Sequence, residues 1–472
     1  MEIFEQITKD DAKEILEVAL SGGGDFADLY VESRTATSIL CEEDRIENIS
    51  TGIDCGAGIR VVDEDRVLYI QTNDLTIEGL KKAAEEAALA VGKSRKVNPK
   101  ELVESDLVES TVEIDPSAVP ISEKTEAVLA ANNACRACSD KIVQVTVGYV
   151  DGKREILIAN SEGIFTKESR VSTRFSVNAV ARDGDVVQTG YESRGGVQGF
   201  EVMKGAEELA QIAGDRAVKM LSAKPAPAGK MTVVMSSSAG GTMVHEACGH
   251  GLEGDLVYRG MSVYAGKLGE VVASEKVTVI DDATMEGKYG YYGYDDEGTK
   301  GQKTVLIENG VLKTYMTDLR YAKKLGLEPT GNGRRQSYAH RPVPRMSNTY
   351  IAAGTDDPDE IIRSTEKGLF VTKMGGGQVN TTNGEFVFDV AEGYLIEDGK
   401  IGPLVRGATL IGNGPQVLRD IEMVGSDLGF AIGVCGKEGQ GVPVSDAQPT
   451  IKIKSMTIGG LVEEEEIGRA HV

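Results

Sequence analysis

The chain has 472 residues, with 51 Lys and Arg against 74 Asp and Glu, which gives a formal net charge of −23. This charge argues against a protein whose main task is binding nucleic-acid phosphates or an anionic membrane surface. A hydrophobic fraction of 40% with 26% charged residues is typical of globular domains. No segment approaches the roughly 20 apolar residues of a membrane-spanning helix, and the acidic N-terminus does not resemble a signal peptide. A cytoplasmic location is therefore predicted.

The first predicted unit is an N-terminal α+β domain over residues 1–100. TKDDAKEILEVAL has the periodicity of an amphipathic helix, with Thr8 or Asp10 as its N-cap. Runs rich in β-forming residues follow, with a hairpin turn at residues 63–65. LTIEGLKKAAEEAALAVGK is predicted to close the unit as a second helix.

Two more units are predicted, and together the three give an α+β fold class. A central α+β domain over residues 115–224 begins and ends with a helix. Its antiparallel strands are predicted to turn at residues 151–152, 161–163 and 183–184. After the linker AKPAPAGK, residues 230–465 are rich in Gly and short strands. They are predicted to form a β-rich, barrel-like or sandwich-like domain with helices at its edges.

Cysteine and histidine, which carry much metal and nucleophile chemistry, are scarce. Six cysteines do not make a disulfide framework in a chain of this length. Cys135 and Cys138 form a lone CxxC inside a predicted helix and are interpreted as small buried residues. His471 follows the acidic run near the C-terminus and is predicted to have no role. The other histidines are His245, His250 and His340.

The sequence HEACGH, residues 245–250, is an HExxxH motif at the start of the third unit. The zinc-peptidase motif HExxH places its histidines at i and i+4 on one helix face. Spacing of i and i+5 would separate the rings by about 140° on a regular helix. A π-bulge, or a helix ending near Gly249, would bring both rings to one metal. Glu246 would then be the general base. The alternative is a pair of surface or capping histidines on a Gly-broken helix.

A catalytic zinc needs three protein ligands and one open position. Nearby candidates for the third ligand are Cys248, Glu253 and Asp255, and distant ones are His340 and Cys435. Glu253, at i+3 from His250, would give a two-histidine, one-glutamate site. Cys435 lies in the Gly-flanked segment FAIGVCGKEGQGVPV, and zinc favours a thiolate. The local sequence leaves Glu253 and Cys435 as open alternatives.

Several further segments carry a resemblance to a known family. They are HEACGHGLEGD, DDEGTKGQKTVLIENGVLKTYM, PTGNGRRQSYAHRPVPRMSNTY, GGGQVNTTNGEFVF, VRGATLIGNG and GVCGKEGQ. With them the chain closely resembles the TldD/PmbA family of metalloproteases, long described as modulators of DNA gyrase. The likeness covers most of the third unit and, more weakly, the layout of the first two. The chain resembles the TldD branch of this family more than the PmbA branch, because it has an intact HExxxH motif, which the PmbA branch lacks.

This resemblance implies that His245, His250 and Cys435 bind zinc and that Glu246 is the catalytic glutamate. It also implies hydrolysis of unfolded or short peptides by a homodimer, or by a heterodimer with a PmbA-like homologue. No direct contact with nucleic acid or membrane is expected. The alternative is a non-catalytic partner or regulatory subunit of a TldD/PmbA-type complex.

A basic cluster stands out in this acidic chain. It could hydrogen-bond a reaction oxyanion or a peptide carboxylate, or it could be a structural loop paired with acids. Its members are Arg334, Arg335, Tyr338, His340, Arg341 and Arg345. The Gly-rich stretches lack nucleotide-binding motifs and are interpreted as turns and sites of close backbone approach. Edge strands near them could bind an extended peptide by strand addition.

Overall fold

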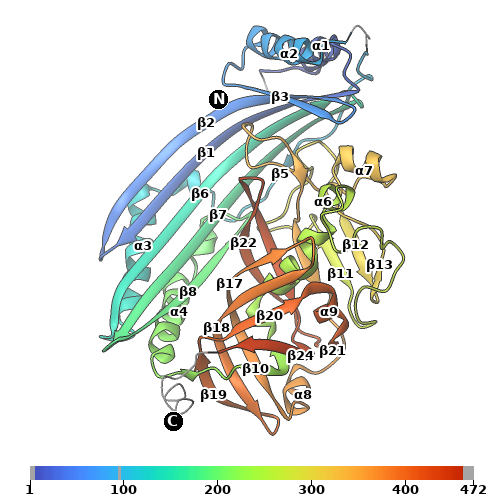
Figure 1. Cartoon of the computed structure of the whole chain (residues 1–472). Coiled ribbons are helices and arrows are strands. Elements are labelled where there is room, and N and C mark those ends of the chain that lie inside the picture. The colour runs from blue at the N-terminus through green and yellow to red at the C-terminus, as the bar shows by residue number, and fades with distance from the viewer. Residues whose placement is uncertain (1–5, 94–96, 461–472) are drawn as a thin grey trace, which may run out of the picture.

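The computed structural model describes residues 6–93 and 97–460 (Figure 1). His471 and the outer ends of the first and third predicted domains lie outside these residues. A long, curved eight-stranded sheet joins the first two predicted units, because β1 pairs with β6 along almost its whole length. The strands are β1 (Phe26–Glu42), β2 (Arg45–Asp63), β3 (Arg66–Thr72), β4 (Val103–Glu104), β5 (Val108–Glu109), β6 (Ile142–Asn160), β7 (Ile164–Asp183) and β8 (Val186–Gly196).

Helices cover one face of this sheet because its strands alternate apolar side chains toward that face. Residues such as Leu29 pack with the first helix pair at one end, and residues such as Tyr149 pack with the second pair at the other. The C-terminal unit lies against the opposite face, where Tyr338 packs on Tyr30 (Figure 1). The helices are α1 (Lys9–Leu20), α2 (Ile77–Val91), α3 (Ile121–Arg136) and α4 (Ala206–Met220).

Most local signals correspond to the observed elements. Thr8 caps α1, with Asp11 completing a reciprocal capping box. The predicted turns at residues 63–65, 161–163 and 183–184 lie between strands. Cys135 is fully buried and Cys138 partly buried, as expected for small packing residues.

The turn predicted at Asp151–Gly152 is wrong, because β6 runs straight through these residues. Gly152 is needed there for close approach, since a Cβ would lie 2.4 Å from the carbonyl oxygen of Thr35 on β1. Asp151 is buried and forms an ion pair with the buried Lys124 of α3. The sequence alone does not distinguish a Gly that allows two strands to approach closely from a Gly in a turn.

The C-terminal unit contains the expected barrel. Pairing in the order β17-β10-β24-β20-β18 is closed by a further pairing of β18 with β17, and the interior is filled by apolar side chains. β9, β19 and β21 extend this sheet. The strands are β9 (Lys224–Pro225), β10 (Gly229–Met235), β17 (Lys367–Asn380), β18 (Glu385–Glu397), β19 (Lys400–Arg406), β20 (Thr409–Asn413), β21 (Ile421–Val424) and β24 (Ile451–Gly459).

A second sheet of the same unit, with strand order β13-β12-β11-β16-β23-β22, places β22 at its edge. Its strands are β11 (Val279–Asp282), β12 (Lys303–Glu308), β13 (Val311–Leu312), β16 (Asn348–Ile351), β22 (Gly429–Lys437) and β23 (Gln440–Gln448), and β14 (Gly333–Arg334) pairs with β15 (Val343–Pro344). The helices are α5 (Thr242–Val244), α6 (Gly254–Tyr258), α7 (Leu319–Leu325), α8 (Pro358–Arg363) and α9 (Gly414–Arg419).

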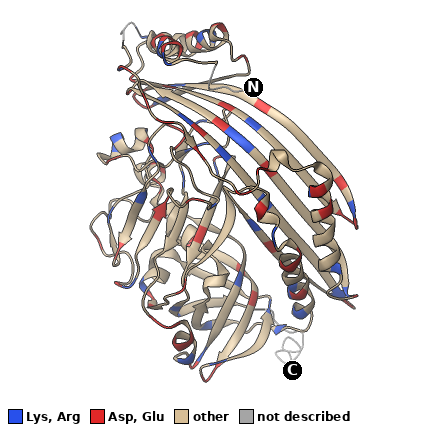
Figure 2. Cartoon of the chain, turned by 180° about the vertical axis from the view of Figure 1, so that it is seen from behind, with Lys and Arg blue, Asp and Glu red and all other residues tan. Residues whose placement is uncertain are grey.

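Charged residues of both signs are interspersed over the sheet and the helices (Figure 2). No helix among the described residues is long and apolar enough to span a membrane.

Candidate metal centre and its cavity

The HExxxH segment leaves the barrel after β10 and forms a short, irregular helix. α5 leads into a π-helical turn at His245–Gly249, and a 3₁₀ turn follows at His250–Leu252. The backbone N–H of His250 donates to the carbonyl of His245, which is the i to i+5 hydrogen bond of a π turn. The predicted π-bulge is therefore confirmed. It absorbs the extra residue that separates HExxxH from HExxH.

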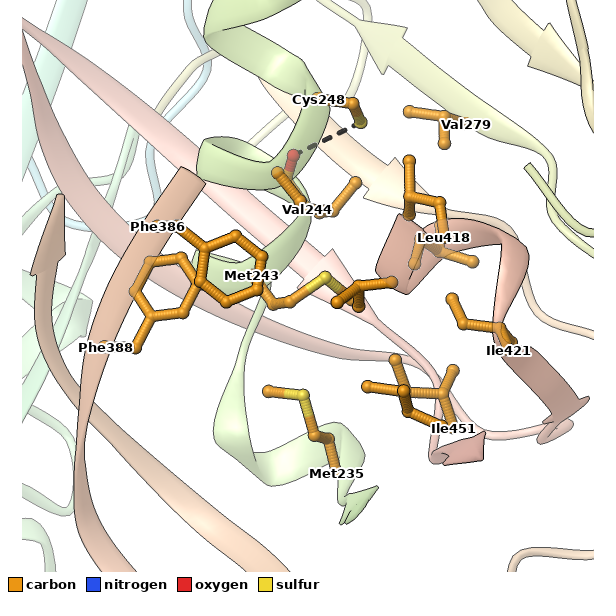
Figure 3. Close-up of a cluster of buried hydrophobic side chains, with 14 of the residues drawn as sticks. Met235, Met243, Val244, Cys248, Val279, Phe386, Phe388, Leu418, Ile421 and Ile451 are labelled. Atoms are coloured by element: carbon orange, nitrogen blue, oxygen red, sulfur yellow. Dashed lines mark hydrogen bonds between the residues drawn. The ribbon is translucent and has the colours of Figure 1, made fainter. Parts of the chain in front are cut away.

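Apolar side chains pack the other face of this short helix against the hydrophobic core. Met243, Val244 and Cys248 point into the core, where Phe386 and Phe388 stack with ring centroids 4.6 Å apart (Figure 3). The Cys248 thiol contacts the Val244 carbonyl, and burial raises its pKa to about 12. Cys248 is therefore a core residue on the face opposite the histidines, which removes it as a candidate ligand.

Gly249 is required by close packing and not by an unusual backbone conformation. Its φ of −51° and ψ of −61° are ordinary helical values, far from the left-handed region that favours glycine. A Cβ at this position would lie 2.2 Å from the Sδ of Met346, which is fully buried. The Met346 side chain therefore leaves no room for any side chain larger than that of glycine at position 249.

Gly249→Ala should destabilise the protein by about 1–3 kcal/mol through this overpacking and should weaken metal binding. Urea unfolding and a chelator competition measure the two effects. Met346→Ala supplies the second arm of a double-mutant cycle, because it removes the clashing atom. A coupling energy below about 0.5 kcal/mol would show that Met346 is not the reason for Gly249.

Three of the candidate ligands lie together at the surface of this helix. One ligand atom from each of His245, His250 and Cys435 lies within 4.8 Å of the others. The Nε2 of His250 is 3.6 Å from the Sγ of Cys435. The rings of His245 and His250 are nearly perpendicular, at 86°, with centroids 4.9 Å apart. Cys435 arrives on the edge strand β22, so the cluster joins the barrel-derived helix to the second sheet.

Acidic side chains hold the other nitrogen of each ring. The Nδ1 of His245 is 2.8 Å from Asp446 Oδ1 on β23, and the Nδ1 of His250 is 3.2 Å from Glu253 Oε2. Lys437 donates to Glu253 at 2.9 Å and to Asp255 at 2.6 Å. Because a carboxylate contacts the Nδ1 of each ring, the Nε2 of each histidine is free to bind a metal ion. Metal-ligating histidines commonly have this arrangement.

Electrostatics favour a thiolate in this cluster. Burial opposes ionisation of Cys435, but the adjacent His245 and His250 outweigh it and lower the pKa of the thiol to about 5. Burial also opposes the charge on Glu253, yet Lys437 and His250 lower the pKa of its carboxyl to about 2. Two imidazole Nε2 atoms and one thiolate form a donor set that fits zinc.

Glu246 is partly buried on the same cavity wall, and burial raises the pKa of its carboxyl above the ordinary value. The cavity has a volume of about 700 Å³. It is lined by the cluster, by residues of β17 and by most of β22. A raised carboxyl pKa beside a metal ligand suits a proton acceptor.

Other predicted candidates lie elsewhere. Glu253 and Asp255 are engaged with Lys437, so neither belongs to the ligand cluster. His340 contacts Ser337, and its side chain does not line the cavity among the described residues.

The basic cluster is largely structural. Arg334, Arg335 and Arg345 are almost fully buried and donate to backbone carbonyls. One of those acceptors is the carbonyl of Cys435, which Arg345 holds in place. This arrangement favours the structural interpretation of the three residues over a role at the reaction oxyanion.

Asp446 and Lys437 were missed by sequence reasoning. Asp446 lies 201 positions from the histidine that it contacts. Acidic and basic residues are common in this chain, so no local motif marks either one.

Comparisons with known proteins agree with the arrangement. The family model of the PmbA/TldA metallopeptidase C-terminal domain matches residues 228–460, the central-domain model matches residues 114–221, and the domain 1 model matches residues 27–91. The metalloprotease TldD homolog of Haemophilus influenzae is 38% identical over 448 residues, covering 92% of this chain and 93% of that protein. The zinc metalloprotease TldD homolog of Saccharolobus solfataricus is 30% identical, covering 93% and 98%.

Solved structures share the fold at lower identity. TldE from Thermococcus kodakarensis has a TM-score of 0.75 at 20% identity, covering 95% of this chain and 100% of that one. A Thermotoga maritima protein described as a candidate modulator of a DNA gyrase has a TM-score of 0.78 at 22% identity, covering 96% and 100%. The three family models match most of the chain, and the predicted enzyme class is confirmed. The chain belongs to the PmbA/TldD metallopeptidase family.

Proposed function

We propose that this protein is a zinc metalloprotease that hydrolyses peptide bonds of unfolded or short peptides. The observation that carries the proposal is the convergence of His245, His250 and Cys435 within 4.8 Å, with Glu246 on the wall of the same cavity. The name of the Saccharolobus solfataricus relative supports zinc as the metal.

His245 and His250 would each donate Nε2 and Cys435 would donate its thiolate, leaving one coordination position open. When bound, zinc supplies Lewis acidity toward the peptide carbonyl and lowers the pKa of a water molecule toward ~7. Asp446 would orient the His245 ring and Glu253 the His250 ring. Each carboxylate would accept a hydrogen bond from Nδ1–H, which keeps the ring proton on Nδ1.

Glu246 would act as the general base. Its carboxylate would accept the proton of the attacking water and deliver it to the leaving amine. Partial burial raises its pKa, so the carboxylate accepts a proton more readily than an exposed glutamate would.

The cavity supports an extended peptide as substrate. β22 is an edge strand that lines the cavity and carries Cys435. An added strand would therefore pass close to the proposed metal. An unfolded or short peptide can offer such a strand anywhere along its length, whereas most backbone groups of a folded protein are already hydrogen-bonded. We further propose that the chain works in the cytoplasm as a homodimer, or as a heterodimer with a PmbA-like homologue.

Zinc analysis of the purified chain, combined with cleavage of unfolded peptides, tests the proposal. We expect about one zinc per chain, loss of cleavage after chelation and recovery on zinc addition. Protein that holds zinc yet cleaves no peptide, with or without a PmbA-like partner, would favour the alternative of a non-catalytic subunit.

A further inference from the structure

A second cavity of about 320 Å³ adjoins the proposed metal site, and its lining is unusually basic for this chain. Arg259 lines both cavities. Three further cations line the second one, against a single acid: Arg320, Lys324 and Arg341, with Asp65 as the acid. In a chain of net charge −23, a cavity with this balance attracts anionic groups.

Tyrosine rings hold the cations in place. The guanidinium carbons of Arg259 and Arg320 lie 5.9 and 5.3 Å from the ring centroid of Tyr321, and the Nζ of Lys324 lies 4.8 Å from that of Tyr258. The Tyr321 hydroxyl also accepts a hydrogen bond from Arg259 at 3.0 Å. Charged groups fixed in this way lose less conformational entropy when a ligand binds.

Arg320 has unused capacity for a ligand. One of its terminal nitrogens donates to the backbone carbonyl of Asp65 at 2.6 Å. Its Nε is buried and has no hydrogen-bond partner within the described part of the chain. Among the described residues it forms no ion pair, whereas Lys324 pairs with Asp65. Lys324, and to a lesser extent Arg320, lower the pKa of the exposed Asp65 carboxyl, but the Arg320 guanidinium forms no ion pair with that carboxylate. Arg320 therefore retains donors for a further acceptor.

A carboxylate of the chain itself already binds to two of these cations. Glu438, three residues after Cys435, lies 2.7 Å from Arg341 and 3.4 Å from Arg259, at the boundary of the two cavities. With Glu438 included, four cationic side chains of the basic cavity face two carboxylates, those of Asp65 and Glu438. A further carboxylate would therefore be balanced by Arg320 and its neighbours.

We propose that this basic cavity binds a carboxylate of the peptide substrate, supplied either by an Asp or Glu side chain or by the C-terminus. The proposal rests on the proposed peptidase function and adds a specificity to it. A peptide extended along the metal cavity would place a nearby carboxylate next to Arg259, and Arg320 and Arg341 would bind it.

Matched unfolded peptides test the proposal with the zinc-loaded protein. One sequence is made with Glu or with Gln near the scissile bond, and each with a free or an amidated C-terminus. We expect the preferred carboxylate to lower KM by about tenfold. Loss of this advantage on amidation alone identifies the C-terminus as the source, and loss on the Glu-to-Gln change alone identifies the side chain.

Arg320→Gln and Arg341→Gln should each reduce the KM ratio of neutral to carboxylate peptides from about ten toward one. Arg341 is 39% exposed at its side chain, and its substitution removes one ion pair, with Glu438, and no buried packing. Arg363→Gln is the matched control, since it changes an exposed arginine on α8, at the other end of the C-terminal unit from α7 (Figure 1). It should keep the ratio.

A binding measurement separates this proposal from the peptidase function. Fluorescence anisotropy with the Glu246→Gln variant should give the same carboxylate preference in Kd without cleavage. Equal KM values for all four peptides, or a preference that survives in the Arg320→Gln and Arg341→Gln double variant, would overturn the proposal. Absence of any cleavage would instead contradict the peptidase function, while a carboxylate-dependent Kd would still support the cavity.

Discussion

Glu246→Gln should lower peptide cleavage by about 10²–10⁴-fold, the contribution of general acid–base catalysis, and leave zinc content unchanged. Glutamine has nearly the same shape and retains the packing of the partly buried side chain, but it cannot accept the proton of water. The glutamate is not one of the three clustered ligands, so metal binding does not depend on it. Cleavage rate and zinc per chain are measured on the same preparation.

Glu397→Gln is a suitable control, because Glu397 is exposed at the end of β18, outside the metal cavity. It should change neither quantity. Glu246→Gln protein that cleaves peptides at close to the parent rate would contradict the assigned base. Loss of zinc from this variant would instead indicate that Glu246 helps to hold the metal.

Cys435→Ala should weaken zinc binding by more than about 100-fold, because even partners in the outer shell contribute 10–100-fold. The thiolate is the proposed third donor and the anionic member of the cluster. Burial opposes its ionisation, but the adjacent histidines outweigh this effect and lower the pKa of the thiol to about 5. Its loss leaves only the two imidazole donors. Zinc affinity from chelator competition measures the effect, and cleavage should fall with zinc occupancy.

Cys248→Ala is the matched control, because it removes a buried thiol from the short helix that carries the two histidines, on the side of that helix that faces the core. It should retain zinc. Glu253→Gln tests the competing third ligand. It should cost about 10–100-fold in zinc affinity by loosening His250, without abolishing binding. Full zinc content in Cys435→Ala, together with complete loss in Glu253→Gln, would reverse the choice of ligand.

The local structure of the HExxxH segment could be predicted from the sequence because its decisive features are local. The i and i+5 spacing of His245 and His250 is incompatible with one metal on a regular α-helix, and a π turn is the local way to absorb one extra residue. The cap at Thr8 is local in the same sense, since it depends on residues within one turn.

Sequence patterns did not determine which distant residues complete the site. Without the family resemblance, Glu253 and Cys435 remained equal alternatives as third ligand. The structure places Glu253 behind His250, in contact with Lys437, and places Cys435 beside the imidazole Nε2 atoms. No local pattern marks Asp446, because its contact with His245 exists only after β23 packs against the start of the helix, where the Gly241 N–H donates to the Asp446 carbonyl.

The turn wrongly predicted at residues 151–152 has the same origin. Gly152 permits close approach to β1, and that neighbour is more than one hundred positions away in the chain. The sequence by itself therefore determined the helix types, most turns and the two motif histidines. Only the tertiary structure showed which distant side chain lies beside the histidines, which carboxylates lie behind them and that a basic cavity adjoins them. Local patterns depend on hydrogen bonds within a few residues, whereas these features depend on strand pairing and packing between distant segments, which leave no fixed spacing in the chain.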